Sequence, residues 1–566
     1  MTNGEWRGRP APPFGFANSL GLTPFQAHLL YSRGVRDRAD ADLFLTGDAR
    51  LFHDPMSLPD MENAVERLAR AVAEREKIAI FGDFDTDGIT GTALLVHTLR
   101  DLGNTALPYI PDRTDEGHGL NKQAVESLAE QGVTVLITVD CGTTSFDEVA
   151  QANALGMDVI ITDHHIVESE LPAAHAIVNP QRPDSLYPFL GLTGAGLAFK
   201  LGQALLQHLG RPVPSRLMEL AALGTVADVG PLIGENRVIV RLGLNSMKTT
   251  NEPGIAALAN AAGLDLGSLN SEALSFNIIP RLNAAGRLGH ASISLDLLTT
   301  QDDEQARRIA NTLDRLNTER QKITERTMIE ARRQVSEQDH GSDSVIIVGH
   351  QEWLPGILGL VAGRLSEEHN RPVVAMTQGD ETSRASVRSV PGVDVHAALD
   401  EADVEFLRFG GHAQAAGFTI ANGDVERLRQ TLSDAIARQR NETDAEVVLE
   451  YDCEVPLSLL TKQTMAFIDS LAPHGAANPE PVFLSRNLRI MDARMVGAEG
   501  KHLKLRVGQN GSSITDAIAF RQGPRYALLP NQVDMLYSVG IDTWNGRSRM
   551  QLRVLDFRPS GAQPGS

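Results

Sequence analysis

The fold class of this chain can be inferred outward from residues 77–91, KIAIFGDFDTDGITG. The run Ile78–Phe81 is short, continuous and apolar, which predicts a buried β-strand. Three aspartates follow at alternate positions, Asp83, Asp85 and Asp87. Carboxylates gathered at the end of one buried strand repel one another, so this concentration of negative charge needs a physical explanation.

Similar apolar runs recur between residues 51 and 250, and helical stretches separate them. The runs are TALPYIPD, VTVLITVD, MDVIITD and HAIVNP, and one of the helical stretches is ENAVERLARAVAE. In that stretch Val65, Leu68, Ala69 and Val72 recur at helical spacing. Strands that alternate with helices are typical of βαβ units and of a parallel sheet. We therefore expect an α/β fold, with a doubly wound domain over residues 51–250.

The rest of the chain shows three further patterns. Helical apolar spacing without proline or glycine predicts one long helix over residues 302–336, roughly 50 Å long. The runs SVIIVGH and RPVVAMT and the glycine-rich FGGHAQAAGF predict a second α/β domain. Alternating runs such as HLKLRVGQ and RMQLRVLDF predict a small antiparallel β-barrel. Before the first domain we expect an N-terminal element, 1–50. After it we expect a connecting region 251–337, a second α/β domain 338–445, a barrel 446–558 and a polar tail 559–566.

Composition limits the class of protein. The chain has 566 residues, 42% of them hydrophobic and 22% charged, and no apolar run approaches the length of a membrane span. The first residues lack the basic and apolar segments of a secretory signal, and two cysteines provide no disulfide framework, so we expect a cytoplasmic location. A net charge of −20 argues against a protein that coats nucleic acid nonspecifically, although a confined basic channel stays possible.

Acidic residues and histidines follow several of the predicted strands. In an open parallel sheet the ligand crevice lies outside the carboxyl ends of the strands, so residues that follow different strands meet there. Uncompensated, such a cluster costs several kcal/mol, and divalent cations remove that cost. Besides the three aspartates of the first strand, the candidates are Asp140 in ITVDCGT, the triplet Asp163, His164 and His165 in ITDHHIV, and Asp228 in GTVADVG.

Oxygen ligands with one or two imidazoles favour Mn²⁺ or Mg²⁺ over structural zinc. Five or six ligands suffice for two ions, the arrangement that assists phosphoryl transfer. The alternative is that each aspartate caps a turn or a helix N-terminus, which explains one such residue but not the whole set.

The motifs resemble those of a known enzyme group. DFDTD, Asp140, the triplet beginning at Asp163, and Asp228 resemble in order the four motifs of the DHH phosphoesterase superfamily. Further segments resemble its bacterial RecJ exonuclease family: IPDRTDEGHGLN, LGLTGAGLAFKL, ALGTVADVGPLIGENR, IIPRLNAAGRLG, LPGILGLVAGRL, FGGHAQAAG and WNGRSRMQL. The resemblance covers nearly the whole chain and implies a DHH domain, a long helix, a DHHA1 domain and an OB-like barrel.

The resemblance also implies roles for individual residues. Asp140 would bridge two metal ions, His165 would contact the scissile phosphate, and Asp163 would orient the neighbouring histidines. Some relatives carry a histidine four residues before the Asp-x-Asp pair, where this chain has Phe81, so the first ion is expected to lack an imidazole. The expected metal ligands are Asp83, Asp85, Asp87, Asp140, His164 and Asp228.

Substrate phosphates need positive charge near the metal ions. Arg113 and Arg281 are the leading candidates, followed by Arg287. Paired glycines before a helical stretch would expose backbone N–H groups to an anion, although Ala385 stands where relatives usually have a glycine. By resemblance to DHHA1 motifs, the other candidates for phosphate or DNA binding are Ser386, Arg388, Ser389, Gly410, Gly411 and His412. In the barrel, the aromatic residues that could stack bases or fill the core are Phe520, Tyr537 and Trp544.

The resemblance implies an Mn²⁺- or Mg²⁺-dependent 5′-to-3′ exonuclease that hydrolyses single-stranded DNA in repair and recombination. It also implies a single-stranded-DNA-binding protein as partner. We further expect no membrane association and a monomer. One alternative is a phosphodiesterase for short oligoribonucleotides or cyclic dinucleotides, which the extra barrel disfavours. Another is a non-enzymatic replication scaffold, which the complete set of metal ligands disfavours.

Overall fold

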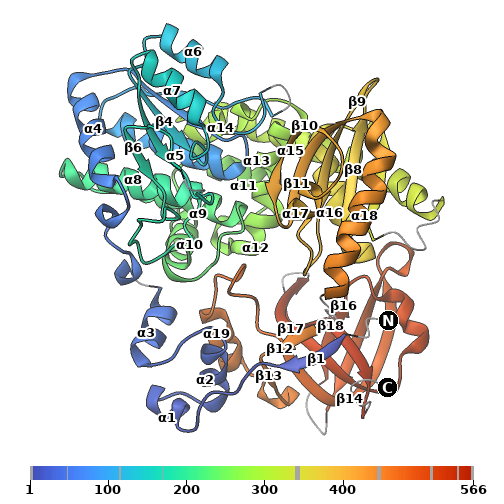
Figure 1. Cartoon of the computed structure of the whole chain (residues 1–566). Coiled ribbons are helices and arrows are strands. Elements are labelled where there is room, and N and C mark those ends of the chain that lie inside the picture. The colour runs from blue at the N-terminus through green and yellow to red at the C-terminus, as the bar shows by residue number, and fades with distance from the viewer. Residues whose placement is uncertain are drawn as a thin grey trace. The chain divides into compact units, whose positions relative to one another are not determined.

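The computed structural model describes residues 4–47, 49–113, 116–167, 170–337, 344–442, 448–509, 514–544 and 547–561. The chain forms two compact units (Figure 1). The larger comprises His53–Gly230 and Ile239–Ala445, and the smaller comprises Met1–Phe52, Pro231–Val238 and Glu446–Ser566. Within the described residues, no helix combines the length and the apolar character that a bilayer span requires.

The larger unit begins with a five-stranded, all-parallel sheet of order β3-β2-β4-β5-β6. Both β2 and β4 are buried along their whole length, which explains their uninterrupted apolar sequence. The strand order reverses between β2 and β4, and in such sheets this switch point opens the ligand crevice. The strands are β2 (Ile78–Gly82), β3 (Leu107–Tyr109), β4 (Val135–Val139), β5 (Asp158–Thr162) and β6 (Ala176–Val178).

Helices pack on this sheet, and further helices follow its last strand in the sequence (Figure 1). Residues of α6 (Lys122–Glu130) and α7 (Phe146–Ala154) share an apolar core with one face of the strands. The other helices between residues 61 and 299 are α4 (Met61–Glu74), α5 (Thr86–Asp101), α8 (Gly194–His208), α9 (Ser215–Ala227), α10 (Gly234–Met247), α11 (Pro253–Ala261), α12 (Ser271–Ala273), the π-helix η4 (Leu274–Ile278), α13 (Ile279–Leu288) and α14 (Ser292–Thr299). The predicted α/β fold with a parallel sheet is therefore confirmed.

The predicted long helix is also confirmed. Helix α15 runs from Asp303 to Glu337, 35 residues, or roughly 52 Å at the α-helical rise. Its N-terminal part packs against α11, α13 and α14, and its C-terminal part against the second sheet and α16 (Leu358–His369). One helix thus carries elements of both α/β domains of this unit.

The second sheet has the order β10-β11-β9-β8-β7. Only β7 and β8 pair in parallel. The prediction that a helix follows the paired glycines is wrong: Gly410 and Gly411 lie inside β10 and pair with Gly417 and Ala416 of β11. The chain reverses there in a tight hairpin. The elements are β7 (Ile346–His350), β8 (Val373–Gln378), β9 (Thr382–Arg388), α17 (Val395–Asp400), β10 (Phe406–His412), β11 (Ala415–Ala421) and α18 (Val425–Glu442).

The smaller unit contains the predicted barrel. Strands β14, β15, β16, β18 and β17 pair in that order, and the additional β14–β17 pairing closes the ring. The barrel is not wholly antiparallel, because β16 and β18 run in parallel. Its strands are β13 (Cys453–Glu454), β14 (Phe483–Val496), β15 (His502–Gly508), β16 (Thr515–Ala519), β17 (Gln532–Trp544) and β18 (Arg547–Pro559), with α19 (Lys462–Ser470) before β14.

The N-terminal element packs with this barrel. Strand β1 (Glu5–Gly8) pairs with β12 (Val448–Tyr451), and apolar residues of α1 (Phe16–Leu20), α2 (Pro24–Tyr31) and α3 (Arg38–Thr46) share one core with barrel residues. Of the aromatic candidates, Tyr537 is fully buried in that core, whereas Phe520 is exposed. The side chain of Trp544 lies outside the described residues.

Candidate metal and phosphate site

The three aspartates after β2 occupy different structural positions. Asp83 follows the strand and is buried. Asp85 is the N-cap of α5, and its carboxylate accepts hydrogen bonds from the backbone N–H groups of Asp87 and Gly88. The capping alternative is thus correct for Asp85, although the cap uses only its Oδ1 atom.

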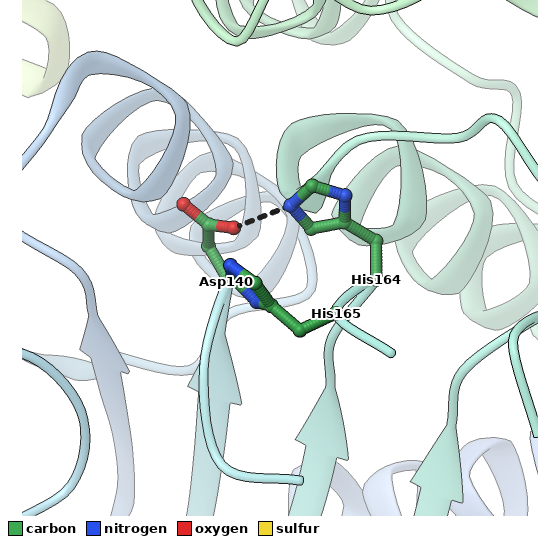
Figure 2. A group of neighbouring side chains, drawn as sticks. All are labelled: Asp140, His164 and His165. Carbon is green, nitrogen blue, oxygen red and sulfur yellow. Dashed lines mark ion pairs between the residues drawn. The ribbon is translucent and has the colours of Figure 1, made fainter. Parts of the chain in front are cut away.

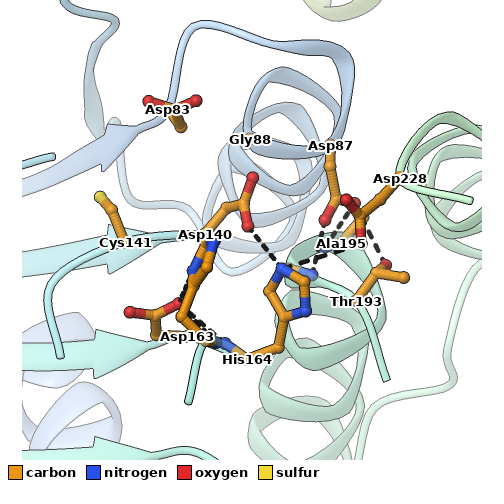
Figure 3. Close-up of polar contacts among 12 residues, drawn as sticks. Asp83, Asp87, Gly88, Asp140, Cys141, Asp163, His164, Thr193, Ala195 and Asp228 are labelled. Atoms are coloured by element: carbon orange, nitrogen blue, oxygen red, sulfur yellow. Dashed lines mark hydrogen bonds and ion pairs between the residues drawn. The ribbon is translucent and has the colours of Figure 1, made fainter. Parts of the chain in front are cut away.

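Asp87 is held by the N-terminus of α8. Its carboxylate accepts hydrogen bonds from the Thr193 hydroxyl (3.1 Å) and from the backbone N–H groups of Gly194 (2.7 Å) and Ala195 (3.0 Å). A Cβ atom added at Gly224 would lie 2.5 Å from the Asp87 carboxylate, so α9 also approaches it closely. These contacts fix the carboxylate in one orientation (Figure 3).

Asp140 follows β4, and His164 follows β5, the neighbouring strand. His164 Nε2 lies 3.0 Å from Asp140 Oδ1 (Figure 2). It also lies 3.8 Å from a carboxylate oxygen of Asp228, the C-cap of α9 (Figure 3). Asp140 Oδ1 is buried and has no hydrogen-bond partner among the described residues, although His164 is close. An acceptor oriented in this way is suited to a cation.

Asp163 and His165 form a hydrogen-bonded pair. The Asp163 carboxylate accepts from the backbone N–H groups of Thr143 (3.0 Å) and His164 (2.8 Å), and it lies 2.7 Å from His165 Nδ1. Burial alone would raise the pKa of Asp163, but the hydrogen bonds from His165 and Thr143 outweigh burial and lower it. The same pairing raises the pKa of His165 to about 9, so this imidazole is protonated at neutral pH.

Four other carboxylates of the cluster have raised pKa values. Burial is the largest cause at Asp85, Asp87, Asp140 and Asp228, and repulsion from neighbouring aspartates adds to it at the first three. For Asp87 the pKa rises to about 7. Burial likewise raises the pKa of the Cys141 thiol well above its usual range, so the thiol stays protonated. A cluster of acids that resist ionisation is the electrostatic environment that a cation relieves.

Donor atoms in this cluster lie close enough together to share ions. Three sets of side chains each bring one ligand atom per residue within 4.8 Å of the others. Asp140 belongs to two of these sets, as does His164. The sets are Asp83, Asp85 and Asp140; Asp87, His164 and Asp228; and Asp140, His164 and His165. The predicted ligands are therefore brought together, and oxygen atoms with an imidazole fit Mn²⁺ or Mg²⁺.

Sequence reasoning missed two residues that touch the acidic segment. Asn283 of α13 accepts hydrogen bonds at Oδ1 from the backbone N–H (3.1 Å) and the hydroxyl (2.9 Å) of Thr86. His118 places Nδ1 3.2 Å from Asp83 Oδ1. Both lie in the segments RLNAAGR and DEGHGLN, which drew attention only as family-like motifs. Neither shows a strand-end or spacing pattern that would predict the contact.

A second group beside the aspartates consists of partly buried guanidiniums. Arg113 lies over the Phe84 ring, with its guanidinium carbon 4.7 Å from the ring centroid. Burial lowers the pKa of Arg287 to about 9, and repulsion from Arg113, Arg320 and Arg388 contributes. None of Arg113, Arg287 and Arg388 forms an ion pair with a described carboxylate, so their positive charges can bind an anion.

The remaining predicted phosphate residues have varied surroundings. Arg281 is already paired with Asp314 (2.8 Å), so its charge is compensated. The Ser389 hydroxyl donates to the carbonyl of Val393 (2.7 Å), whereas Ser386 accepts from Arg388 (3.2 Å). His412, at the end of β10, stacks near His165 with ring centroids 5.9 Å apart. The predicted roles of these residues, of Gly410 and of Gly411 stay predictions.

Comparison with known proteins gives this geometry a family. Residues 77–225 match the DHH family, N-terminal domain, residues 342–438 the DHHA1 domain, and residues 451–556 the RecJ OB domain. The single-stranded-DNA-specific exonuclease RecJ of Dickeya dadantii is 34% identical, over 98% of this chain and 99% of that protein. The chain belongs to the RecJ family. The RecJ of Bacillus subtilis is 38% identical, over 95% of this chain and 68% of that protein.

Solved RecJ structures agree with the fold. RecJ of Thermus thermophilus in complex with Mn²⁺ has a TM-score of 0.85 and 32% identity, over 99% of this chain and 80% of that one. The same enzyme with Mg²⁺ has a TM-score of 0.79 and 31% identity, over 99% and 79%. Family members thus bind the two cations that the donor set of this chain favours, and the expected fold and family are confirmed.

Proposed function

We propose that this chain is a metal-dependent exonuclease that hydrolyses the phosphodiester bonds of single-stranded DNA in the 5′-to-3′ direction. The observation that carries the proposal is the three overlapping donor sets at the switch point of a RecJ-family sheet. Membership of that family, whose named relatives are single-stranded-DNA-specific exonucleases, supports the substrate.

We assign the ligands to two ions. Asp83 and Asp85 would hold one ion, and Asp87, His164 and Asp228 would hold the other. Asp140, which belongs to the set with Asp83 and also lies with His164 in another set, would contribute to both. Two divalent ions bound in this way supply charge compensation for the carboxylates and lower the pKa of a coordinated water. The N-terminus of α8 fixes Asp87 through three hydrogen bonds, so this ligand needs no reorganisation when the substrate arrives.

His165 contributes a positive charge beside these ligands. Its pairing with Asp163 keeps the imidazole protonated at neutral pH, and the ring is half-exposed, with 43% of its side chain accessible. An imidazolium whose Nδ1–H is held by Asp163 presents Nε2–H outward, where it donates to an oxygen of the scissile phosphate. That hydrogen bond strengthens as charge develops on the phosphate, so we assign His165 a catalytic role.

The guanidinium cluster supports binding of a second phosphate. Arg113, Arg287 and Arg388 are partly buried, Arg113 repels the other two, and none forms an ion pair with an acidic side chain among the described residues. The pKa of Arg113 is affected by the charges of Asp83 and Asp85, so this cluster is adjacent to the metal ligands. A neighbouring phosphate of the same strand would compensate the cluster and place the scissile bond at a fixed distance from it, as expected of an exonuclease.

The alternative substrates are short oligoribonucleotides and cyclic dinucleotides. The same donor sets would serve them, but neither requires the closed barrel that matches the RecJ OB domain. A non-enzymatic scaffold has no need for a complete ligand set. As further parts of the proposal, the chain acts as a cytoplasmic monomer in DNA repair and recombination, and a single-stranded-DNA-binding protein is its partner.

The test uses end-labelled oligonucleotides with purified protein. With Mn²⁺ or Mg²⁺, a 5′-labelled single strand should release labelled mononucleotide at once, while a 3′-labelled strand should shorten gradually. Duplex DNA and RNA should resist, and EDTA should stop the reaction. Immediate release of a 3′ label would refute the direction, and equal cleavage of duplex or activity in EDTA would refute the proposal as a whole.

A further inference from the structure

His118 lies on a loop whose geometry is fixed at both ends. Gly117 and Gly119 flank it with φ of +84° and +80°, a backbone region that residues other than glycine rarely adopt. The Glu116 carboxylate anchors the loop, because it accepts hydrogen bonds from the hydroxyl of Tyr109 and the amide of Asn121. A short segment is thus folded so that one imidazole projects from it.

The imidazole reaches the acidic cluster. His118 Nδ1 lies 3.2 Å from Asp83 Oδ1, and its ring packs on the Phe84 ring with centroids 4.2 Å apart. Asp83 is buried, whereas 72% of the His118 side chain is exposed. An exposed imidazole therefore contacts a buried carboxylate of the cluster.

Within the described part of the chain, His118 is the imidazole that contacts Asp83, whereas His164 contacts Asp140. The Asp83–Asp85–Asp140 set contains only carboxylates, whereas each of the other two sets includes His164. Phe81 cannot supply the missing ring, because it is fully buried and stacks on Tyr109 with centroids 5.3 Å apart.

We propose that His118 is a positioning residue for Asp83: its Nδ1–H holds one carboxylate oxygen outward, and the other oxygen is thereby turned toward the ion shared with Asp85. The proposal rests on the metal site of the proposed function. It places the missing imidazole beside the ligand instead of on the metal. Loss of a residue that orients a metal ligand weakens binding about tenfold or more, and the exposure of His118 favours the lower end of that range.

The test separates the nitrogen from the ring. His118→Phe keeps the ring contact with Phe84 but removes the donor, His118→Asn keeps an amide donor near the Nδ1 position, and His118→Ala removes both. Mn²⁺ binding is measured by electron paramagnetic resonance of the free ion, without DNA, together with kcat and KM on single-stranded DNA. The matched control is His175→Ala, because His175 lies 4.0 Å from Asp158 at the opposite end of the same sheet.

We expect His118→Ala and His118→Phe to weaken one class of Mn²⁺ site about tenfold, and His118→Asn to stay within about threefold of the wild type. At fixed low Mn²⁺ the first two should lose kcat, and excess Mn²⁺ should restore it. Wild-type Mn²⁺ affinity in His118→Ala or His118→Phe, or an affinity in His118→Asn as weak as in His118→Ala, would overturn the inference. A wild-type chain that binds Mn²⁺ but does not cut single-stranded DNA would overturn the proposed function alone.

Discussion

Acidification should release the metal ions from this site over a pH range that the structure sets. The pKa of Asp87 in the metal-free fold is about 7, mainly because the carboxyl is buried and also because Asp228 is close. A ligand must lose its proton before it binds a cation, so protons and metal compete for Asp87. As pH falls through about 7, Asp87 becomes protonated and the apparent metal affinity must fall.

The magnitude follows from that pKa. For one group with a pKa near 7, the fraction that is ionised falls about 25-fold between pH 7.5 and 5.5, and the apparent Mn²⁺ affinity falls by the same factor. The pKa values of Asp85, Asp140 and Asp228 are also raised, so a 25-fold loss is a lower limit. The same raised pKa also affects folding. As pH rises from about 4 to 7, a carboxyl with a raised pKa lowers the free energy of unfolding of the metal-free protein, and bound metal offsets that loss.

The assay is isothermal titration calorimetry with Mn²⁺ at several pH values, repeated in two buffers of different ionisation enthalpy. The buffer dependence counts the protons released, and we expect about one or more per protein near pH 6.5. The control is Asp184→Asn, because hydrogen bonding to Arg182 lowers the pKa of that outlying carboxyl. An affinity that is flat from pH 7.5 to 5.5, with no proton release, would refute the electrostatic reasoning.

Three further predictions concern single substitutions. Asp140→Asn should reduce turnover at least about a thousandfold without lowering the melting temperature of the metal-free protein at pH 8, because it removes a carboxylate that resists ionisation; cleavage assays and calorimetry check both parts. Gly194→Ala should weaken Mn²⁺ binding, because its Cβ would lie 2.5 Å from the Asp140 Cβ. Gly196→Ala should not weaken it, because the nearest contact of its Cβ would be 3.4 Å away. Equal affinities of the two variants in a Mn²⁺ titration would contradict this. Between pH 7 and 5 the free energy of unfolding of His474→Gln should fall by about 2 kcal/mol less than that of the wild type, because burial lowers the pKa of His474 to about 4 while the unfolded chain takes up a proton from about pH 6.5 downward. Urea unfolding followed by circular dichroism measures this difference. Parallel pH profiles would show that His474 is not responsible.

The fold and the acidic cluster could be predicted because they depend on local pattern. A continuous apolar run buries a parallel strand, and the residue after it must emerge at the carboxyl edge, so Asp83, Asp140 and His164 could be placed together before any coordinates. The helix from Asp303 to Glu337 follows in the same way from apolar spacing and the absence of proline and glycine.

The remainder depends on contacts between distant segments, which pattern does not encode. Whether Arg281 is available to a phosphate depends on Asp314, which lies on a different helix, α15, and pairs with it. Whether Gly410 begins a helix or lies in a strand depends on its pairing with Gly417 across a hairpin. The core shared by α1, α2, α3 and the barrel joins residues more than 400 positions apart in the chain. His118 meets Asp83 for the same kind of reason, since the loop geometry fixes the contact.

The backbone at Asp140 limits how the enzyme can be inactivated cleanly. Its φ of +63° lies in the left-handed region, which costs most side chains roughly 1 kcal/mol or more and which asparagine tolerates well. An Asp140→Ala change therefore mixes two effects, a lost carboxylate and a strained turn, and a drop in expression could be mistaken for a catalytic defect. For trapping an uncut oligonucleotide in a crystal, Asp140→Asn is the better choice, because it preserves the turn and alters only the charge.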